Sequence, residues 1–146
     1  MPDFCNIKLD IFSSLQDVSS SGLAEGEAEN TESHCDGIMK RTADGSLFIS
    51  YEESSENGKI YSDIKITDSK IAVRRRGAIE STLIFEDGVL HKSTYTLPPY
   101  TLDMEVFTKK IRRDMHFGKG ELTLIYNMNV GGAARSCIMK ITVSTA

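Results

Sequence analysis

The stretch IAVRRRGAIESTLIF (residues 71–85) alternates apolar and polar side chains with the period of a β-strand. Its odd positions carry large apolar residues, namely Ile71, Val73, Ile79, Leu83 and Phe85. Successive side chains of a strand point to opposite faces, so these residues share one face, and Arg75 is carried onto that face with them. The stretch therefore predicts strands on either side of Gly77 with an arginine directed toward the interior.

Turn signals extend this pattern over the chain. Four dipeptides typical of hairpin turns separate alternating runs: Asp44-Gly45, Asn57-Gly58, Asp87-Gly88 and Gly131-Gly132. The alternation predicts strands near 5–16, 34–42, 46–54, 59–67, 70–77, 78–86, 89–96, 100–108, 109–117, 120–128 and 134–144. Gly77 and Thr108 mark either strand ends or bends within longer strands.

Short strands in simple order form an antiparallel meander, and closure of the meander removes the unpaired edge strands that invite aggregation. The sequence therefore predicts an all-β fold, a single antiparallel meander closed into one barrel domain over residues 1–146, with a sandwich as the alternative. Residues 107–117, FTKKIRRDMHF, also fit a helical stripe. Their clean alternation and the short turn that follows favour a strand.

The composition narrows the classes of partner. The chain has 146 residues, a net charge of −4 and no apolar run of the roughly 18 residues that cross a membrane. An acidic chain lacks the basic surface that attracts DNA or anionic lipid, so neither DNA nor a membrane is expected as a partner. The start MPDFCNIKLD does not resemble a signal peptide, and the three cysteines lack CxxC spacing. A cytoplasmic protein with reduced thiols is expected.

One segment departs from the alternation. Residues 18–33, VSSSGLAEGEAENTES, contain four glutamates, no basic residue and few large apolar side chains. Such a composition predicts a mobile acidic loop. It could serve as a lid or a docking arm, or it could be a solvated connector.

Arg75 is the main functional signal. A guanidinium without a partner in an apolar interior costs several kcal/mol, so a carboxylate, water or a bound anion should meet it. Two interpretations stay open: a buried Arg–Glu pair supported by a tyrosine hydroxyl, or an interior that binds a small anionic or amphipathic ligand. The residues that parity places near the arginine are the candidate ligand-binding set: Arg75, Ser81, His91, Tyr95, Thr108, Glu52 and Glu53.

These strands also resemble a known family. The run RRGAIESTLIFEDGVLHKSTYTLPPYTLDMEVFTKKI, together with LFISYEE and LTLIYNMNVGGAARSCIMKITV, is similar to the YwiB-like family, a bacterial domain of unknown function. The resemblance implies a calycin-like, lipocalin-type β-barrel and brings no established activity. The positions that match the family pattern are Arg75, Gly77, Phe85, Gly88, His91, Tyr95 and Thr108. The sequence departs from the pattern at Leu97-Pro98-Pro99-Tyr100, where the family commonly has Thr-Pro-Tyr-Gly.

Other chemical motifs are weak. The neighbours His34, Cys35 and Asp36 alternate in direction along a strand and cannot converge on one metal, so no metal site and no cofactor are expected. The run FGKGELT lacks the spacing of a phosphate-binding loop. The basic residues Arg74, Arg76, Lys110 and Arg112 could form one outer wall if their strands come together.

Three classes of function follow from these observations. The first is a barrel that binds a small anionic amphiphile, with Arg75 on the acidic group. The second is an interaction or structural module with a filled core, whose protein partner the sequence does not name. The third is an enzyme in which His91 is the acid or base and Tyr95 or Arg75 stabilises charge. Because no nucleophile, carboxylate pair or metal triad is visible, no catalytic residue is assigned.

Overall fold

The computed structural model describes residues 3–19 and 24–146, and over these ranges the chain is built from strands. They are β1 (Phe4–Val18), β2 (Ala24–Arg41), β3 (Leu47–Ser55), β4 (Gly58–Ile66), β5 (Ile71–Gly77), β6 (Glu80–Phe85), β7 (Leu90–Leu97), β8 (Tyr100–His116), β9 (Lys119–Val130) and β10 (Ala133–Thr145). In the residues that the structure describes, no helix is long and apolar enough to cross a lipid bilayer.

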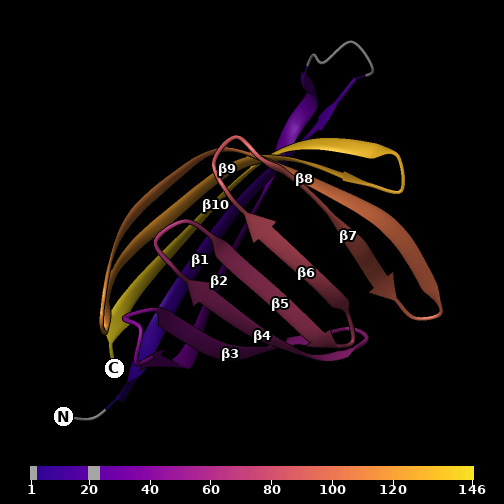
Figure 1. Ribbon diagram of the computed structural model, residues 1–146. Helices are drawn as coiled ribbons and strands as arrows, with labels where there is room; N and C mark the ends of the chain where they lie inside the picture. The colour runs from indigo at the N-terminus through magenta and orange to yellow at the C-terminus, as the bar shows by residue number, and fades with distance from the viewer. Residues whose placement is uncertain (1–2, 20–23) are drawn as a thin grey trace.

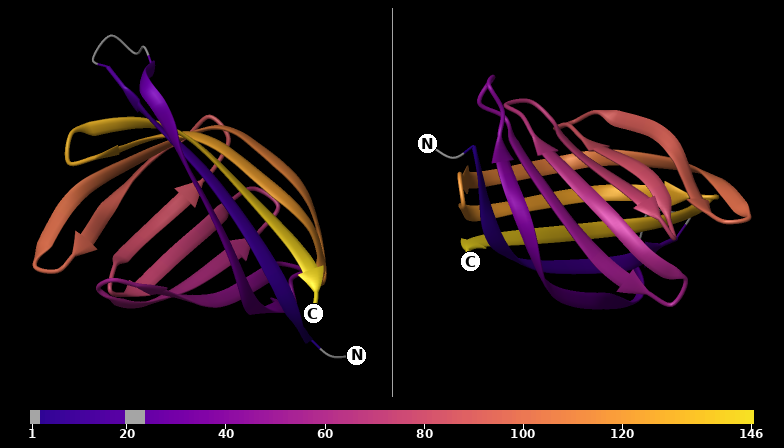
Figure 2. Two further views of the ribbon diagram at one scale, coloured as in Figure 1. Left: turned by 180° about the vertical axis from the view of Figure 1, so that it is seen from behind. Right: turned by 90° about the horizontal axis from the view of Figure 1, so that it is seen from below.

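The strands form one closed antiparallel barrel. Each strand pairs with its neighbours in the chain, and β1 also pairs with β10, which closes the sheet. Figure 1 shows this order around the barrel, and Figure 2 shows the strands of opposite walls crossing at an angle. The predicted meander and its closure into a barrel are confirmed, and the sandwich alternative is excluded.

Of the two positions that could be either strand ends or bends, Gly77 is a strand end and Thr108 lies within a strand. Gly77 ends β5: its φ is 104°, and a Cβ there would lie 2.4 Å from the carbonyl oxygen of Lys59, so only glycine fits. Thr108 lies inside β8, where the register against β9 shifts between Thr108 and Lys110. The segments expected at 100–108 and 109–117 are therefore one long strand with a β-bulge.

Inward-facing apolar side chains fill one end of the barrel. One layer runs across five neighbouring strands through residues that are paired in register, namely Met39, Ile49, Ile64, Val73 and Leu83. Phe85 is fully buried, and its ring meets the ring of Tyr126 edge to face with centroids 4.8 Å apart. Each fully buried aliphatic or aromatic side chain contributes about 1.5–3 kcal/mol to stability, so this end supplies most of the core.

The segment at 18–33, predicted as a mobile loop, is largely part of a β-hairpin. Residues 24–33 belong to β2 and pair with β1, for example Glu29 with Leu15 and Glu32 with Phe12, so a loop is wrong for this part of the segment. The hairpin of β1 and β2 extends beyond the other strands (Figure 1), and the described β2 side chains at 27–32 are exposed. The acidic, apolar-poor composition indicates that these side chains are exposed, but it does not show whether the backbone forms a strand. Here backbone hydrogen bonds to β1 hold the strand. Residues 20–23 of the expected loop lie outside the described residues.

The basic residues do not form one outer wall. Arg74 and Arg76 lie on β5, and Lys110 and Arg112 lie on β8, with β6 and β7 between the two strands. Arg76 is also engaged locally, because its Nη2 lies 3.1 Å from Asp63 Oδ2. The condition for one basic wall, that these two strands come together, is therefore not met.

Candidate ligand site inside the barrel

A row of polar side chains crosses the inner wall of the barrel next to the apolar layer. Register places Tyr51 opposite Ser62, Ser62 opposite Arg75, Arg75 opposite Ser81, and Ser81 opposite Tyr95. We call these five residues the polar row. Because hydrogen-bonded neighbours across a sheet point to the same face, five separate strands contribute to one continuous inner band.

The polar row borders a cavity of about 480 Å³. Arg75, Ser81 and Tyr95 line it from the row. Its apolar lining comes mainly from aliphatic and methionine side chains, namely Leu15, Leu83, Met104, Met128, Val130 and Met139. Pockets for small molecules measure about 300–1,000 Å³ and combine an apolar lining with a few polar groups, so this cavity has the size and composition of a binding site.

Arg75 is half-buried and carries the charge of the site. It has no hydrogen bond and no ion pair within residues 3–19 and 24–146. Burial raises the pKa of Tyr51, and the positive charge of Arg75 opposes that rise. The same two effects act on the pKa of Tyr126, which burial also raises. The guanidinium therefore lies close enough to both tyrosines to act on their hydroxyls, yet no carboxylate neutralises it.

Ser62 is a second polar group without a partner. Its hydroxyl oxygen is buried, and within the described part of the chain it makes no hydrogen bond. The hydroxyl lies near that of Tyr51 and acts to lower the pKa of Tyr51, although burial raises that pKa overall, and the two groups do not meet in hydrogen-bond geometry. A buried hydroxyl without a partner costs about 1–3 kcal/mol, so the polar row carries unused hydrogen-bonding capacity.

A second arginine, Arg135, also lines the cavity, but it has an ion-pair partner. Arg135 Nε lies 3.3 Å from Asp17 Oδ1, and both side chains are substantially exposed. Solvent and the carboxylate share in neutralising this guanidinium. The unneutralised charge of the cavity is therefore that of Arg75.

Neither glutamate of β3 pairs with Arg75. Glu52 points outward, where Lys59 Nζ lies 3.6 Å from its Oε1. Glu53 lies on the inward parity and raises the pKa of Tyr51, but it makes no ion pair with Arg75 in the described structure. Of the two interpretations left open, the buried Arg–Glu pair is therefore wrong. The reason is register: Tyr51, rather than a glutamate, occupies the position level with Arg75.

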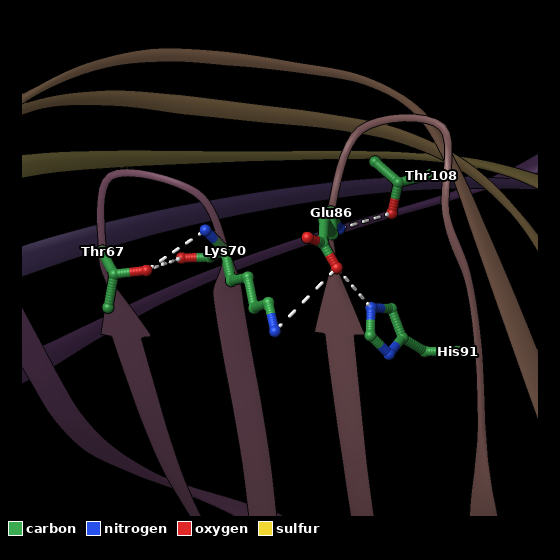
Figure 3. Close-up of polar contacts among 5 residues, drawn as sticks. All are labelled: Thr67, Lys70, Glu86, His91 and Thr108. Carbon is green, nitrogen blue, oxygen red and sulfur yellow. Dashed lines mark hydrogen bonds and ion pairs between the residues drawn. The ribbon is translucent and has the colours of Figure 1, made fainter.

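His91 and Thr108 lie away from the cavity, where the turn after β6 meets the neighbouring strands (Figure 3). His91 Nε2 lies 3.0 Å from Glu86 Oε1, and Lys70 Nζ lies 4.0 Å from the same oxygen. The backbone N–H of Glu86 donates to Thr108 Oγ1 over 3.2 Å. These contacts hold the turn in place. The alternation of the strands predicted which face His91 and Thr108 occupy, but it did not predict how far along the barrel they lie from Arg75.

The outer surface has a larger hollow of about 720 Å³ over β1 to β5. Its arginine is neutralised: Arg76 pairs with Asp63, and Ser50 Oγ donates to Asp63 Oδ1 over 2.9 Å. The hollow is open to solvent, and among the described residues that line it no cation lacks an ion pair. The inner cavity is therefore the stronger candidate site.

The weak metal motif separates as its alternation predicts. His34 points outward, with its Nδ1 2.5 Å from Asp10 Oδ1, whereas Cys35 lies half-buried on the inward parity. Burial, reinforced by nearby carboxylates, raises the pKa of Cys35 to about 11, so its thiol is protonated near neutral pH. Among the residues with described positions, no three His, Cys, Asp or Glu side chains could together hold a metal ion.

Comparison with known proteins places this barrel in a family. A family model described as a domain of unknown function (DUF1934) matches residues 17–141. The chain belongs to this family. It is 28% identical over 85 residues to the uncharacterized β-barrel protein YwiB of Bacillus subtilis (strain 168), a match that covers 58% of this chain and 60% of YwiB. The aligned part thus spans less than two thirds of that relative's length.

The crystal structure of YwiB protein from Bacillus subtilis extends the likeness to the whole fold. It matches with a TM-score of 0.87 and 25% identity, covering 100% of this chain and 95% of that chain. The resemblance to the YwiB-like family is thereby confirmed. The names of these relatives specify no ligand and no reaction, so the site must be interpreted from its own chemistry.

Several residues of the polar row and of the cavity lining were not predicted from the sequence. Tyr51 and Ser62 complete the polar row, and Tyr126 and Arg135 line the cavity from β9 and β10. Alternation was the available signal, because each of these residues shares the parity of buried neighbours in its strand. Alternation does not give the register between strands, which decides which inward residues are level with Arg75.

Proposed function

We propose that this protein binds a small anionic amphiphile inside its barrel. The observation that carries the proposal is the unneutralised, half-buried guanidinium of Arg75 at the wall of a cavity of about 480 Å³. An anionic group of the ligand would form charge-assisted hydrogen bonds with Arg75, and these are stronger than neutral hydrogen bonds. The methionine and leucine side chains of the cavity would cover the apolar body of the ligand.

The neighbours of Arg75 suit this role. Ser81 and Tyr95 flank it in the polar row and can donate hydroxyl hydrogen bonds to the same anion. An occupied site would also relieve the cost of leaving a guanidinium partly desolvated without a partner. The other two classes of function have weaker support. A filled core is not what a cavity of this size suggests, and His91 lies outside the cavity lining.

The test uses two probes of equal chain length, decanoate and decanol, titrated calorimetrically into the protein. We expect decanoate to bind and decanol to bind more weakly, because decanol lacks the charge that Arg75 recognises. Arg75→Met should remove the preference for decanoate, whereas Arg112→Met, at an exposed position on β8, should preserve it. Equal affinity of the wild-type protein for both probes, or no binding of either, would contradict the proposal. Native mass spectrometry of the protein purified from its own cells would then identify the retained ligand.

A further inference from the structure

The wall of the barrel is split between β6 and β7. These two strands pair at only two positions in the described structure, Glu80 with Thr96 and Ser81 with Tyr95, whereas β7 and β8 pair along the full length of β7. Beyond them, Ser93 Oγ donates to the carbonyl oxygen of Thr82 over 2.9 Å, so a side chain spans the seam in place of a backbone ladder.

A hollow of about 310 Å³ lies at this split, and residues of both strand parities line it. Arg74 and Thr82 line it from the outward parity, and Arg75, Ser81 and Ser93 line it from the inward parity. Arg75 and Ser81 also line the inner cavity. The hollow and the inner cavity therefore share two residues, and Arg75 borders both.

The charges around the split are unbalanced. Like Arg75, Arg74 has no ion pair and no hydrogen bond in the parts of the chain with described positions. Arg76 is neutralised by Asp63, and the lining contributes one carboxylate, that of Glu80, which forms no ion pair there. Two arginines without an ion pair in the described structure, Arg74 and Arg75, thus line one hollow from opposite parities of β5.

We propose that this split is an anion subsite for a phosphate monoester, so that the ligand of the inner cavity is a phosphorylated amphiphile. A carboxylate carries one charge and two oxygens in a plane, which a single guanidinium can saturate with a bidentate contact. A phosphate monoester carries a charge near −2 and three strong acceptor oxygens arranged as a tetrahedron. Such a group can face Arg74 and Arg75 together and also accept hydrogen bonds from neighbouring hydroxyls. The assignment of the apolar tail to the inner cavity rests on the proposed function, whereas the anion subsite does not.

The first experiment isolates the subsite with inorganic phosphate. Amide NMR spectra of the labelled protein are recorded while phosphate replaces chloride at constant ionic strength. We expect saturable shifts at residues 74–76, 81–82 and 93–94. Arg74→Gln should weaken the apparent phosphate affinity about tenfold, and the matched control Arg112→Gln should leave it unchanged. Shifts outside the split, or equal loss in both variants, would overturn the subsite.

The second experiment tests the tail and the phosphate together. We expect decyl phosphate to bind about tenfold more tightly than decanoate, and Arg74→Gln to erase that difference while the affinity for decanoate stays unchanged. Equal affinities of the wild-type protein for the two probes would overturn the phosphate assignment. If phosphate shifts the split but neither long-chain probe binds, the proposed inner site fails while the anion subsite stands.

Discussion

Ser62 and Arg75 face each other across β4 and β5, and neither has a hydrogen-bond partner in the described structure. The Ser62 hydroxyl can donate one hydrogen bond and the guanidinium can donate several, so both groups can donate to one acceptor that lies between them. In the described structure these two unpaired groups distinguish this inner wall from a filled apolar core, and each of them gives a separate prediction.

Ser62→Ala should leave the ligand-free protein as stable as the wild type, or more stable by up to about 1 kcal/mol. The reason is that the substitution removes a buried hydroxyl without a partner. Ser50→Ala is the control on the neighbouring strand, because Ser50 Oγ donates to Asp63 and its loss should cost about 1 kcal/mol. Urea unfolding of both variants measures the difference. A loss in Ser62→Ala as large as that in Ser50→Ala would show that the Ser62 hydroxyl has a partner in solution.

Arg75→Met should not destabilise the ligand-free barrel. Removing one member of a buried ion pair typically costs about 3–5 kcal/mol, but Arg75 has no such partner, and methionine suits the apolar surroundings. Arg76→Met, which breaks an exposed pair with Asp63, should lower the free energy of unfolding by at most about 1 kcal/mol. Chemical denaturation compares the two variants. A fall of several kcal/mol in Arg75→Met would reveal a carboxylate paired with the guanidinium.

Thr108→Val should destabilise the barrel by about 1 kcal/mol or more, because the Glu86 N–H loses its acceptor while the side-chain volume is conserved. Thr96→Val is the control, since the Thr96 and Thr101 hydroxyls pair 3.1 Å apart at an exposed position. Amide hydrogen exchange at Glu86 should accelerate in Thr108→Val only. Unchanged protection of that amide would contradict the role of Thr108 in holding the turn.

Stability should fall at alkaline pH because thiols inside the barrel resist ionisation. Burial raises the pKa of Cys137 from 9.0 to about 11. The folded state therefore holds this proton more tightly than the unfolded state, and the resulting stability is fully present below pH 9.0 and is lost as pH rises toward about 11. Unfolding measured at successive pH values should give a shallower alkaline decline in Cys137→Ala than in Cys5→Ala. Equal slopes in the two variants would contradict the assignment of this alkaline loss of stability to Cys137.

His34 should titrate above its ordinary value of 6.5, because its hydrogen bond with Asp10 and the charge of that carboxylate favour the protonated ring. The folded state binds this proton more tightly than the unfolded state, so protonation of His34 adds to the free energy of unfolding. This stabilisation is present below pH 6.5 and is lost as pH rises through the raised pKa, and salt should weaken it because both groups are exposed. NMR titration of the ring protons gives the pKa, and Asp10→Asn should return it toward 6.5. An unaltered titration in that variant would contradict the pairing.

The hairpin turns and the inward direction of Arg75 could be predicted from the sequence because they depend on residues that are close together in the chain. Turn dipeptides such as Asp87-Gly88 set the hairpins, and the two-residue period of a strand put Arg75 on the inward face. Both effects operate within a few residues, so the all-β meander and the inward arginine needed no knowledge of distant strands.

Other features depend on contacts between segments far apart in the chain. β1 supplies the hydrogen bonds that make a strand of residues 24–33, although Glu27, Glu29 and Glu32 within it are acidic and exposed. The bulge after Thr108 sets how β8 meets β9, and register across β3, β4 and β5 puts Tyr51 rather than a glutamate level with Arg75. A shift of one residue in register reverses every facing side chain, and register is a property of strand pairs rather than of one strand. The sequence by itself therefore determined the barrel strands and the inward arginine, and only the tertiary structure decided that this arginine has no partner.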